Sequence, residues 1–326
     1  MGERLASAMW LAQKPARGPQ RARRSRGERV ALCDEVREGC AEIAGSARSV
    51  AIRAADADHA LAGEIARSPR RPQVLDGELH HLDGSPEDVA RFFFTLDSIN
   101  FGSGWFPTLR KQPGRSGYAT IAGRLRDRFR LAGPWSNEQL RRIDTPAIAL
   151  ALGQPADHEL MALYAQALRD LGRWLGERSA LAAVEAAEGS AERFAEQLVR
   201  GMAMFHDPPF HKRAQLLAAD LALASVTTFG DLDRLTIFAD NVVPHVLRCE
   251  GILVYDERLA ARIDAEELLP PGREEREIRA CALHACELLA RHHGMQPRVL
   301  DSWLWNRGQA PAYKARPRHR CRCVFY

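Results

Sequence analysis

The sequence predicts an all-α protein with a compact, single-domain helical fold. Apolar residues recur at helical spacing through most of the chain, and no alternation of strands with helices is visible, which disfavours a parallel α/β sheet. Hydrophobic residues make up 46% of the 326 residues, which is enough for a sizeable core. No run of about 18 consecutive apolar residues occurs, so no membrane-spanning helix is expected.

The first half of the chain is predicted to be a series of amphipathic helices. The clearest helix start is Ser85-Pro86-Glu87-Asp88, with Ser at the N-cap, Pro at N1 and an acid at N3. This helix should run to about Asn100, where Gly102 and Gly104 end it, and a loop over 105–116 follows. Periodicity predicts further helices over 29–44, 55–67, 117–131, 137–150, 156–176 and 190–205.

The second half continues the helical pattern. A helix is expected to begin around Phe210 and to end at Gly230-Asp231, and a helix over 232–248 should be interrupted or kinked at Pro244. Two further helices are predicted over 272–293 and 296–306. The residues from Cys321 to Tyr326 are predicted to form one extended strand.

Positive charge is concentrated at the two ends of the chain. The net charge is +4, but residues 1–30 carry +6 and residues 307–322 carry another +6, which leaves −8 for the remainder. A body of that sign is a poor non-specific binder of nucleic acid, because phosphate binding depends on Lys and Arg. We therefore expect a basic, disordered arm over 1–28, a helical catalytic domain over 29–326, and no stable nucleic-acid partner. A solvated arm and tail is the simplest interpretation of the basic ends, although contacts with RNA or phosphate stay open.

Several common kinds of site lack their usual motifs. The seven cysteines form no CxxC pair, which disfavours zinc-ribbon and thioredoxin-like sites, and reduced thiols in a cytoplasmic protein fit best. His206-Asp207 and His211 have no further ligands at metal-site spacing, so no metal is expected. No GxGxxG, GxxxxGK[ST], HExxH or GxSxG motif is present.

The first candidate site segment runs from Asp97 to Phe106. Polar Asp97 and Asn100 stand at an otherwise apolar helix end, followed by Phe101 and Trp105, two aromatic residues that look exposed. Aromatic faces with an amide nearby suit a planar ring, because the ring stacks and the amide recognises its edge. The alternative is a helix C-terminus with core aromatics.

The second candidate segment, Phe210-His211-Lys212-Arg213-Ala214-Gln215, places two cations at a helix N-terminus. That position normally disfavours cations, and a bound anion, most naturally a phosphate, would resolve the conflict. The alternative is a surface Lys-Arg pair.

The third and fourth segments each place an aspartate among apolar residues. Asp240 lies in the run from Leu235 to Pro244, and burying a carboxylate is costly unless it is paired or functional. Phe238 could stack on a base while Asp240 faces a sugar carbon; alternatively, Asp240 bonds to backbone freed by Pro244. Asp301 heads the run Ser302-Trp303-Leu304-Trp305, where it could accept hydrogen bonds from a base, or be a helix N-cap.

These segments together resemble the queuosine-salvage family, the queuosine 5′-phosphate N-glycosylases, over roughly residues 30–326. The resemblance rests on the order and number of its parts: Asp97–Phe101, Phe210–Leu216, Thr236–Asp240 with Pro244, Cys249–Leu253 with Tyr255, Glu277–Cys281, Leu300-Asp301 with Leu304-Trp305, and Arg320–Tyr326. The stretch between Gln215 and Phe238 looks shorter than in the relatives, so the spacing of Lys212 and Asp240 is compressed.

The resemblance implies an all-helical hydrolase, distantly similar in fold to helical DNA glycosylases, that releases queuine from queuosine 5′-monophosphate. It implies a small-molecule substrate, no membrane, and neither a metal nor a redox cofactor. Asp240 corresponds to the family's catalytic aspartate, and could stabilise the sugar cation by charge, form a transient covalent bond, or orient water. The expected substrate-binding residues are Asn100, Phe101, Trp105, Lys212, Phe238, Asn241, Asp301 and Trp305.

Two other classes of function stay open on the sequence. A non-catalytic tRNA- or nucleoside-binding protein would use the basic ends and show steeply salt-dependent RNA binding. A DNA-lesion glycosylase follows from the analogy of fold alone, and the charge of −8 outside the two ends disfavours the basic duplex-binding face that it needs.

Overall fold

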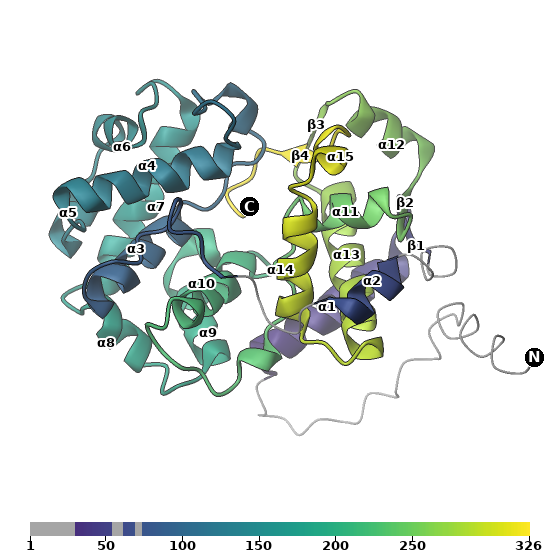
Figure 1. Ribbon diagram of the computed structural model, residues 1–326, viewed down its shortest axis with the longest axis horizontal. Helices are drawn as coiled ribbons and strands as arrows, with labels where there is room; N and C mark the ends of the chain where they lie inside the picture. Colours follow the sequence, from purple (N-terminus) through teal and green to yellow (C-terminus); the bar gives the residue numbers. More distant parts are fainter. Residues whose placement is uncertain (1–29, 54–60, 69–73) are drawn as a thin grey trace, which may run out of the picture. The chain divides into compact units, whose positions relative to one another are not determined.

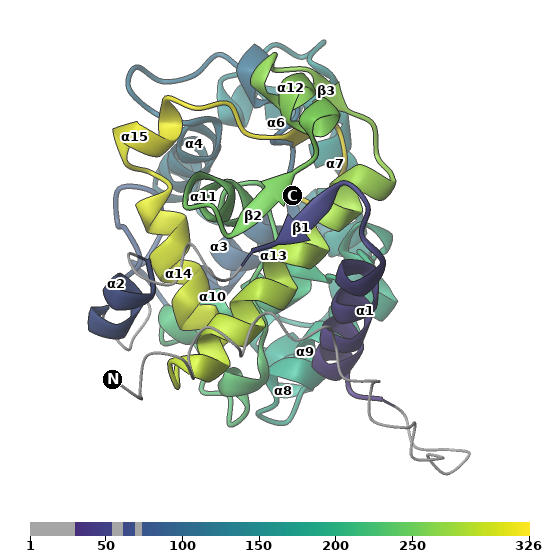
Figure 2. The same cartoon turned by 90° about the vertical axis from the view of Figure 1, so that its right-hand side faces the viewer.

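The computed structural model describes residues 30–53, 61–68 and 74–326, so the predicted basic arm over 1–28 lies outside the described residues. The described part contains fifteen α-helices and four short strands, which confirms the all-α prediction (Figures 1 and 2). No helix in these ranges is both long and apolar enough to cross a bilayer.

Contacts along the backbone divide the chain into two compact units. Unit 1 consists of the described parts of Met1–Pro72 together with Ala239–His319, and unit 2 consists of Gln73–Phe238 together with Arg320–Tyr326. The chain therefore crosses from unit 2 to unit 1 inside the Phe238-Ala239-Asp240 segment. The assignment of 29–326 to one catalytic domain stays a prediction.

Unit 1 is arranged around the long helix α13 (Arg273–His292), which contacts α1, α11, α14 and β1. β1 (Val50–Ile52) pairs antiparallel with β2 (Leu253–Tyr255), so that Ala51 lies opposite Val254. The other elements of this unit are α1 (Leu32–Ser46), α2 (Leu61–Arg67), α11 (Val243–Cys249), α12 (Glu257–Asp264), β3 (Leu268–Leu269), α14 (Pro297–Arg307) and α15 (Pro311–Lys314). Figure 2 shows α1 alongside α13.

A buried carboxylate joins α13 to the chain between α1 and β1. Oε2 of Glu277 accepts hydrogen bonds from the backbone N–H groups of Arg48 and Ser49 at 3.1 and 2.7 Å. Glu277 is 2% exposed, and the two N–H donors satisfy a charge that would otherwise be costly to bury.

Unit 2 is arranged around α3 (Pro86–Ser98), which contacts α4, α7, α8 and α10. The other elements are η1 (Phe106–Thr108), α4 (Gly117–Ala132), α5 (Asn137–Arg142), α6 (Thr145–Leu152), α7 (Glu159–Leu175), α8 (Ala180–Glu185), α9 (Ala191–Gly201), η2 (Ala203–Phe205), α10 (Lys212–Leu223), η3 (Leu232–Arg234) and β4 (Arg320–Cys321). The predicted Ser85 N-cap of α3 is confirmed, with a capping box completed by Asp88.

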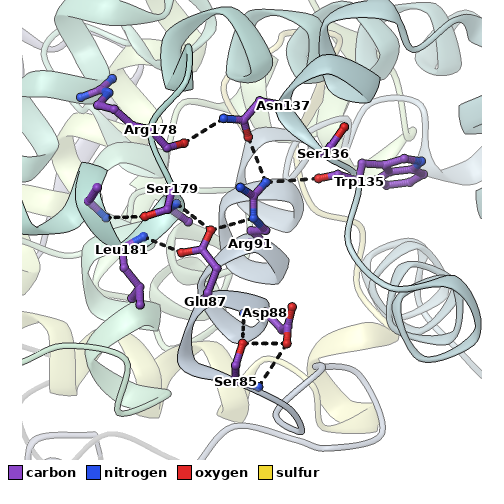
Figure 3. A network of polar contacts seen from close by, with 12 residues as sticks. Ser85, Glu87, Asp88, Arg91, Trp135, Ser136, Asn137, Arg178, Ser179 and Leu181 are labelled. Atoms are coloured by element: carbon purple, nitrogen blue, oxygen red, sulfur yellow. Dashed lines mark hydrogen bonds and ion pairs between the residues drawn. The ribbon is translucent and has the colours of Figure 1, made fainter.

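Polar contacts anchor the first turns of α3 to the neighbouring helices (Figure 3). Both carboxylate oxygens of Glu87 accept N–H groups at the start of α8, from Ala180 and Leu181, each at 2.9 Å. Arg91 donates to Glu87 at 2.7 Å and to the side chain of Asn137, the first residue of α5, at 2.9 Å. This network fixes the direction of α3, whose other end carries Asp97.

Two predicted helices are in fact interrupted. The predicted helix over 137–150 is two helices, because Asp144 starts α6 by accepting a hydrogen bond from the N–H of Ala147 at 2.8 Å. The prediction of one helix over 232–248 was also wrong, since residues 235–242 are not helical and α11 begins only at Val243. Pro244 lies in the first turn of α11, where its missing N–H costs nothing, so it starts a helix instead of kinking one.

Other boundaries moved by a few residues. α10 ends at Leu223 instead of continuing to Gly230, and Ser225 has a left-handed backbone with φ of +58°. Of the predicted strand over 321–326, only Cys321 lies in a strand, together with Arg320 in β4. Residues 54–60 of the predicted helix over 55–67 lie outside the described residues, and 61–67 form α2.

Candidate functional site

Asp240 lies in the non-helical segment just before α11, with 9% of its surface exposed. Its Oδ1 accepts hydrogen bonds from the backbone N–H groups of Val242 and Val243 at 2.7 and 3.1 Å. No residue in the described ranges donates a hydrogen bond to Oδ2. One carboxylate oxygen is therefore held by the backbone, and the other retains its capacity to face a ligand.

The segment that carries Asp240 is held by α13. Nε of Arg279 donates a hydrogen bond to the backbone carbonyl of Ala239 at 2.9 Å, and Nη1 lies 3.4 Å from a carboxylate oxygen of Glu275. Arg279 is 1% exposed, so the ion pair with Glu275 offsets the cost of its burial. Arg279 stood in the sequence resemblance without a role, and the structure places it against the backbone next to Asp240.

A cationic cluster lies near Asp240 in the same unit. The half-buried Arg318 interacts electrostatically with Asp240, and burial lowers the pKa of Arg318 while the carboxylate raises it. The neighbouring His319 is fully buried, and burial together with Arg279, His245 and two further arginines lowers its pKa to about 3. His319 is therefore neutral at physiological pH. Its backbone carbonyl lies 3.3 Å from Nδ2 of Asn241, which donates a hydrogen bond to it.

Asp301 and Trp305 lie one turn apart on α14. Asp301 is the fifth residue of this helix and is buried, with Gln296 at the N-cap position, so its interpretation as an N-cap was wrong. The helix starts earlier because Pro297 occupies its first turn. The carboxylate contributes to the raised pKa of Cys286 on α13, after the larger effect of burial on that thiol. Trp305 is half-buried.

Lys212 and Arg213 begin α10 in unit 2, and both are buried, so the interpretation as a surface pair was wrong. Arg213 donates from Nη1 to the backbone carbonyls of Asp97 and Ser98 at 3.0 and 2.6 Å. Its Nη2 donates to the carbonyls of Met204 and Val324. These four acceptors engage both terminal nitrogens, and the remaining donor, Nε, is buried, so Arg213 joins backbone segments and is not available to a phosphate.

Asp97, whose backbone carbonyl accepts a hydrogen bond from Arg213, lies in the last turn of α3. It is fully buried; its Oδ1 accepts a hydrogen bond from Nδ2 of Asn100 at 3.1 Å, and no described residue bonds to Oδ2. Burial raises the pKa of Asp97 to about 7, against the opposing effects of Asn100, Lys212 and Arg213. Lys212 is therefore close enough to the buried carboxyl group of Asp97 for the two to interact electrostatically.

The aromatic residues after α3 are interior, so their interpretation as exposed was wrong. Phe101 is 1% exposed and packs against the guanidinium of Arg213, whose Cζ lies 4.8 Å from the ring centroid. Trp105 is 4% exposed, and its Nε1 donates to Glu159 at 2.7 Å. Phe238 is also buried. The substrate contacts predicted for these three residues stay predictions.

The predicted site residues fall into two groups by unit. Unit 1 holds Asp240, Asn241, Asp301 and Trp305, and unit 2 holds Asn100, Phe101, Trp105, Lys212 and Phe238.

The sequence-based predictions missed Arg318 and His319, because the run of cations that contains them was interpreted as part of a solvated tail. His319 is in fact only 1% exposed. The sequence did contain one indication that part of this run is buried: His319 and Cys321 stand between its arginines, and cysteine is usually a buried residue. Within the described ranges, no group of three or more His, Cys, Asp or Glu side chains is placed to hold a metal ion.

Comparison with known proteins finds one family throughout. The sequence profile of the family described as "Queuosine salvage protein" matches residues 79–326. A Sphaerobacter thermophilus protein named "Queuosine 5'-phosphate N-glycosylase/hydrolase" is 32% identical over 298 residues, which cover 82% of this chain and 92% of that protein. A Nematostella vectensis protein of the same name is 26% identical over 77% of this chain and 85% of its own length. A Mus musculus protein of that name is 30% identical over 49% of this chain and 56% of its own length. The extent of these matches shows that the chain belongs to the queuosine salvage protein family.

Proposed function

We propose that this protein hydrolyses the N-glycosidic bond of queuosine 5′-phosphate and releases the base queuine. The observation that carries the proposal is the 32% identity to the Sphaerobacter protein over 92% of that protein's length. In the reaction, water adds across the bond between C1′ and the base nitrogen: the hydroxyl group goes to the sugar and a proton goes to the departing base. A cytoplasmic location stays a prediction.

In this proposal, the carboxylate of Asp240 stabilises the positive charge that develops at C1′. As the bond to the base breaks, C1′ becomes a cation-like centre, and a fixed carboxylate close to it lowers the energy of the transition state. The two N–H groups that hold Oδ1 fix the carboxylate in place, and Oδ2 is left for the sugar. Because the group is already oriented, little reorganisation is needed during the reaction.

The remaining site residues bind the base and the phosphate in this proposal. Asp301 accepts hydrogen bonds from the donor edge of the base, and Trp305 and Asn241 contact the substrate. Lys212 binds the 5′-phosphate as a point charge. Asn100 recognises the base edge, while Phe101, Trp105 and Phe238 wall or stack against the base.

The test is incubation of the purified protein with queuosine 5′-monophosphate, the free nucleoside and lesion-containing DNA, followed by chromatography for released base. Queuine release from the nucleotide supports the proposal. Release of a damaged base from DNA, or RNA binding without any base release, would favour one of the two other classes.

Asp240→Asn is the decisive variant. It retains an oxygen that can accept the N–H groups of Val242 and Val243, so the protein should fold, while the loss of the charge should lower kcat by a factor on the order of 10³ or more. Asp264→Asn, on the exposed end of α12, is the matched control and should keep its activity. Queuine release by Asp240→Asn at the rate of the unchanged protein would remove Asp240 from the mechanism.

A further inference from the structure

Arg318 is an unusual arginine within unit 1. Its side chain is half-buried, yet it forms no hydrogen bond and no ion pair with any residue that the structure describes. The carboxylate of Asp240 attracts it electrostatically. No nitrogen of Arg318 is among the buried polar atoms that lack a partner, so its donors remain accessible to a ligand from solvent.

The other basic side chains that surround His319 have hydrogen-bond partners of their own. Arg248 donates to Asp264 at 2.9 Å, and Arg279 is held by Glu275 and the carbonyl of Ala239. Nε2 of His245 lies 2.8 Å from the carbonyl of Tyr313. Arg318 therefore differs from its neighbours in having donors that the described part of the chain leaves unused.

The electrostatic surroundings of Arg318 favour an additional anion. His319 and His245 have lowered pKa values, mainly because of burial, and the charge of Arg318 lowers both further. Among the described residues, Asp240 is the carboxylate whose charge acts on Arg318. Arg248 and Arg279 are paired with Asp264 and Glu275, whereas the guanidinium of Arg318 has no ion-pair partner among the described residues and can attract a ligand of negative charge.

We propose that Arg318 binds the phosphate group of the substrate, an inference that rests on the proposed function. A guanidinium offers two parallel N–H groups to a phosphate, a geometry that matches bidentate recognition. The charge of Asp240 also acts on Arg318. The phosphate of the substrate and the carboxylate of Asp240 carry like charges and repel one another. The positive charge of Arg318 between them in the site reduces that repulsion.

The experiment compares Arg318→Met and Arg318→Lys with the unchanged protein and with Arg258→Met, which removes the same charge from an exposed position on α12. Binding of ribose 5-phosphate, ribose and inorganic phosphate is measured by calorimetry, and kcat and KM are measured for queuosine 5′-monophosphate. Circular dichroism and thermal unfolding check that each variant is folded.

Arg318→Met should weaken the binding of ribose 5-phosphate and inorganic phosphate and raise KM, each by about 10- to 100-fold. Arg318→Lys should lie between Arg318→Met and the unchanged protein, and Arg258→Met should match the unchanged protein. If Arg318→Met binds ribose 5-phosphate normally while kcat falls, Arg318 acts through Asp240 and the phosphate assignment is wrong. Failure of the unchanged protein to bind either phosphate also overturns it. Phosphate binding that depends on Arg318, without release of queuine, would keep this assignment and reject the proposed function.

Discussion

Nε of Arg279 donates a hydrogen bond to the backbone carbonyl of Ala239 at 2.9 Å, and this bond joins α13 to the residue that precedes Asp240. The bond links residues 40 positions apart in the chain. Since Arg279 touches the backbone of the segment and not the carboxylate, its role is to position Asp240.

Arg279→Lys should lower kcat more than it raises KM, because a lysine keeps the charge but cannot reach Ala239 and Glu275 together. Arg279→Ala should lower the free energy of unfolding by about 3–5 kcal/mol, since Glu275 would be left buried without its partner. Urea unfolding and steady-state kinetics measure the two effects, with Arg276→Lys, exposed on the same helix, as control. Equal activity in Arg279→Lys and Arg276→Lys would contradict the positioning role.

Asp240 has a structural task that can be separated from its chemical one. Asp240→Ala removes the acceptor for two backbone N–H groups at the start of α11, so it should be less stable than Asp240→Asn by roughly 1 kcal/mol, while both variants lose activity. Thermal or urea unfolding of the two variants side by side gives the difference. Identical stability of the two variants would mean that the hydrogen bonds to Oδ1 contribute nothing to the fold.

Arg213 is expected to act in stability and not in phosphate binding. Arg213→Lys should lower the free energy of unfolding by at least about 3 kcal/mol, because one ammonium cannot replace a guanidinium that donates to four buried carbonyls. Arg200→Lys, exposed on α9, is the control. A loss below about 1 kcal/mol in Arg213→Lys, together with weaker phosphate binding, would contradict this expectation.

Asp97 should make the stability of the protein depend on pH. Its folded pKa of about 7 lies above the ordinary value of 3.8, so the folded state holds the proton more tightly than the unfolded state. Below pH 3.8 the carboxyl group is protonated in both states, so it does not reduce stability. Between pH 3.8 and about 7 the unfolded state releases its proton while the folded state keeps it, so the free energy of unfolding falls as the pH rises. The full cost above pH 7 is roughly 4 kcal/mol.

Asp97→Asn removes the ionisation and should therefore gain stability relative to the unchanged protein between pH 5 and pH 8. Urea unfolding at these two pH values provides the comparison, and Asp157→Asn, exposed before α7, serves as control. The idea fails if the difference in unfolding free energy between Asp97→Asn and the unchanged protein is the same at both pH values.

Local signals in the sequence were sufficient for the helical class and for many helix positions. Ser85 and Pro86 predicted the start of α3, and periodicity predicted α13 and α14 within one or two residues. Caps and periodicity depend on residues three or four positions apart, which is the range that a sequence pattern covers.

Burial and long-range partners were decided only by the tertiary structure. The segment around Asp240 has an apolar, helix-like composition, but residues 235–242 are not helical. The backbone of Ala239 is held by the distant Arg279, and Pro244 lies in the first turn of the next helix. Phe101 looked exposed because it stands at a helix end just before Gly102 and Gly104, yet it packs against the buried Arg213. The sequence by itself therefore determined the family, the helical class and the choice of Asp240. The surroundings of Asp240, Arg318 included, depend on contacts between residues far apart in the chain, because the free energy of burying a charge is set by neighbours that local spacing does not reveal.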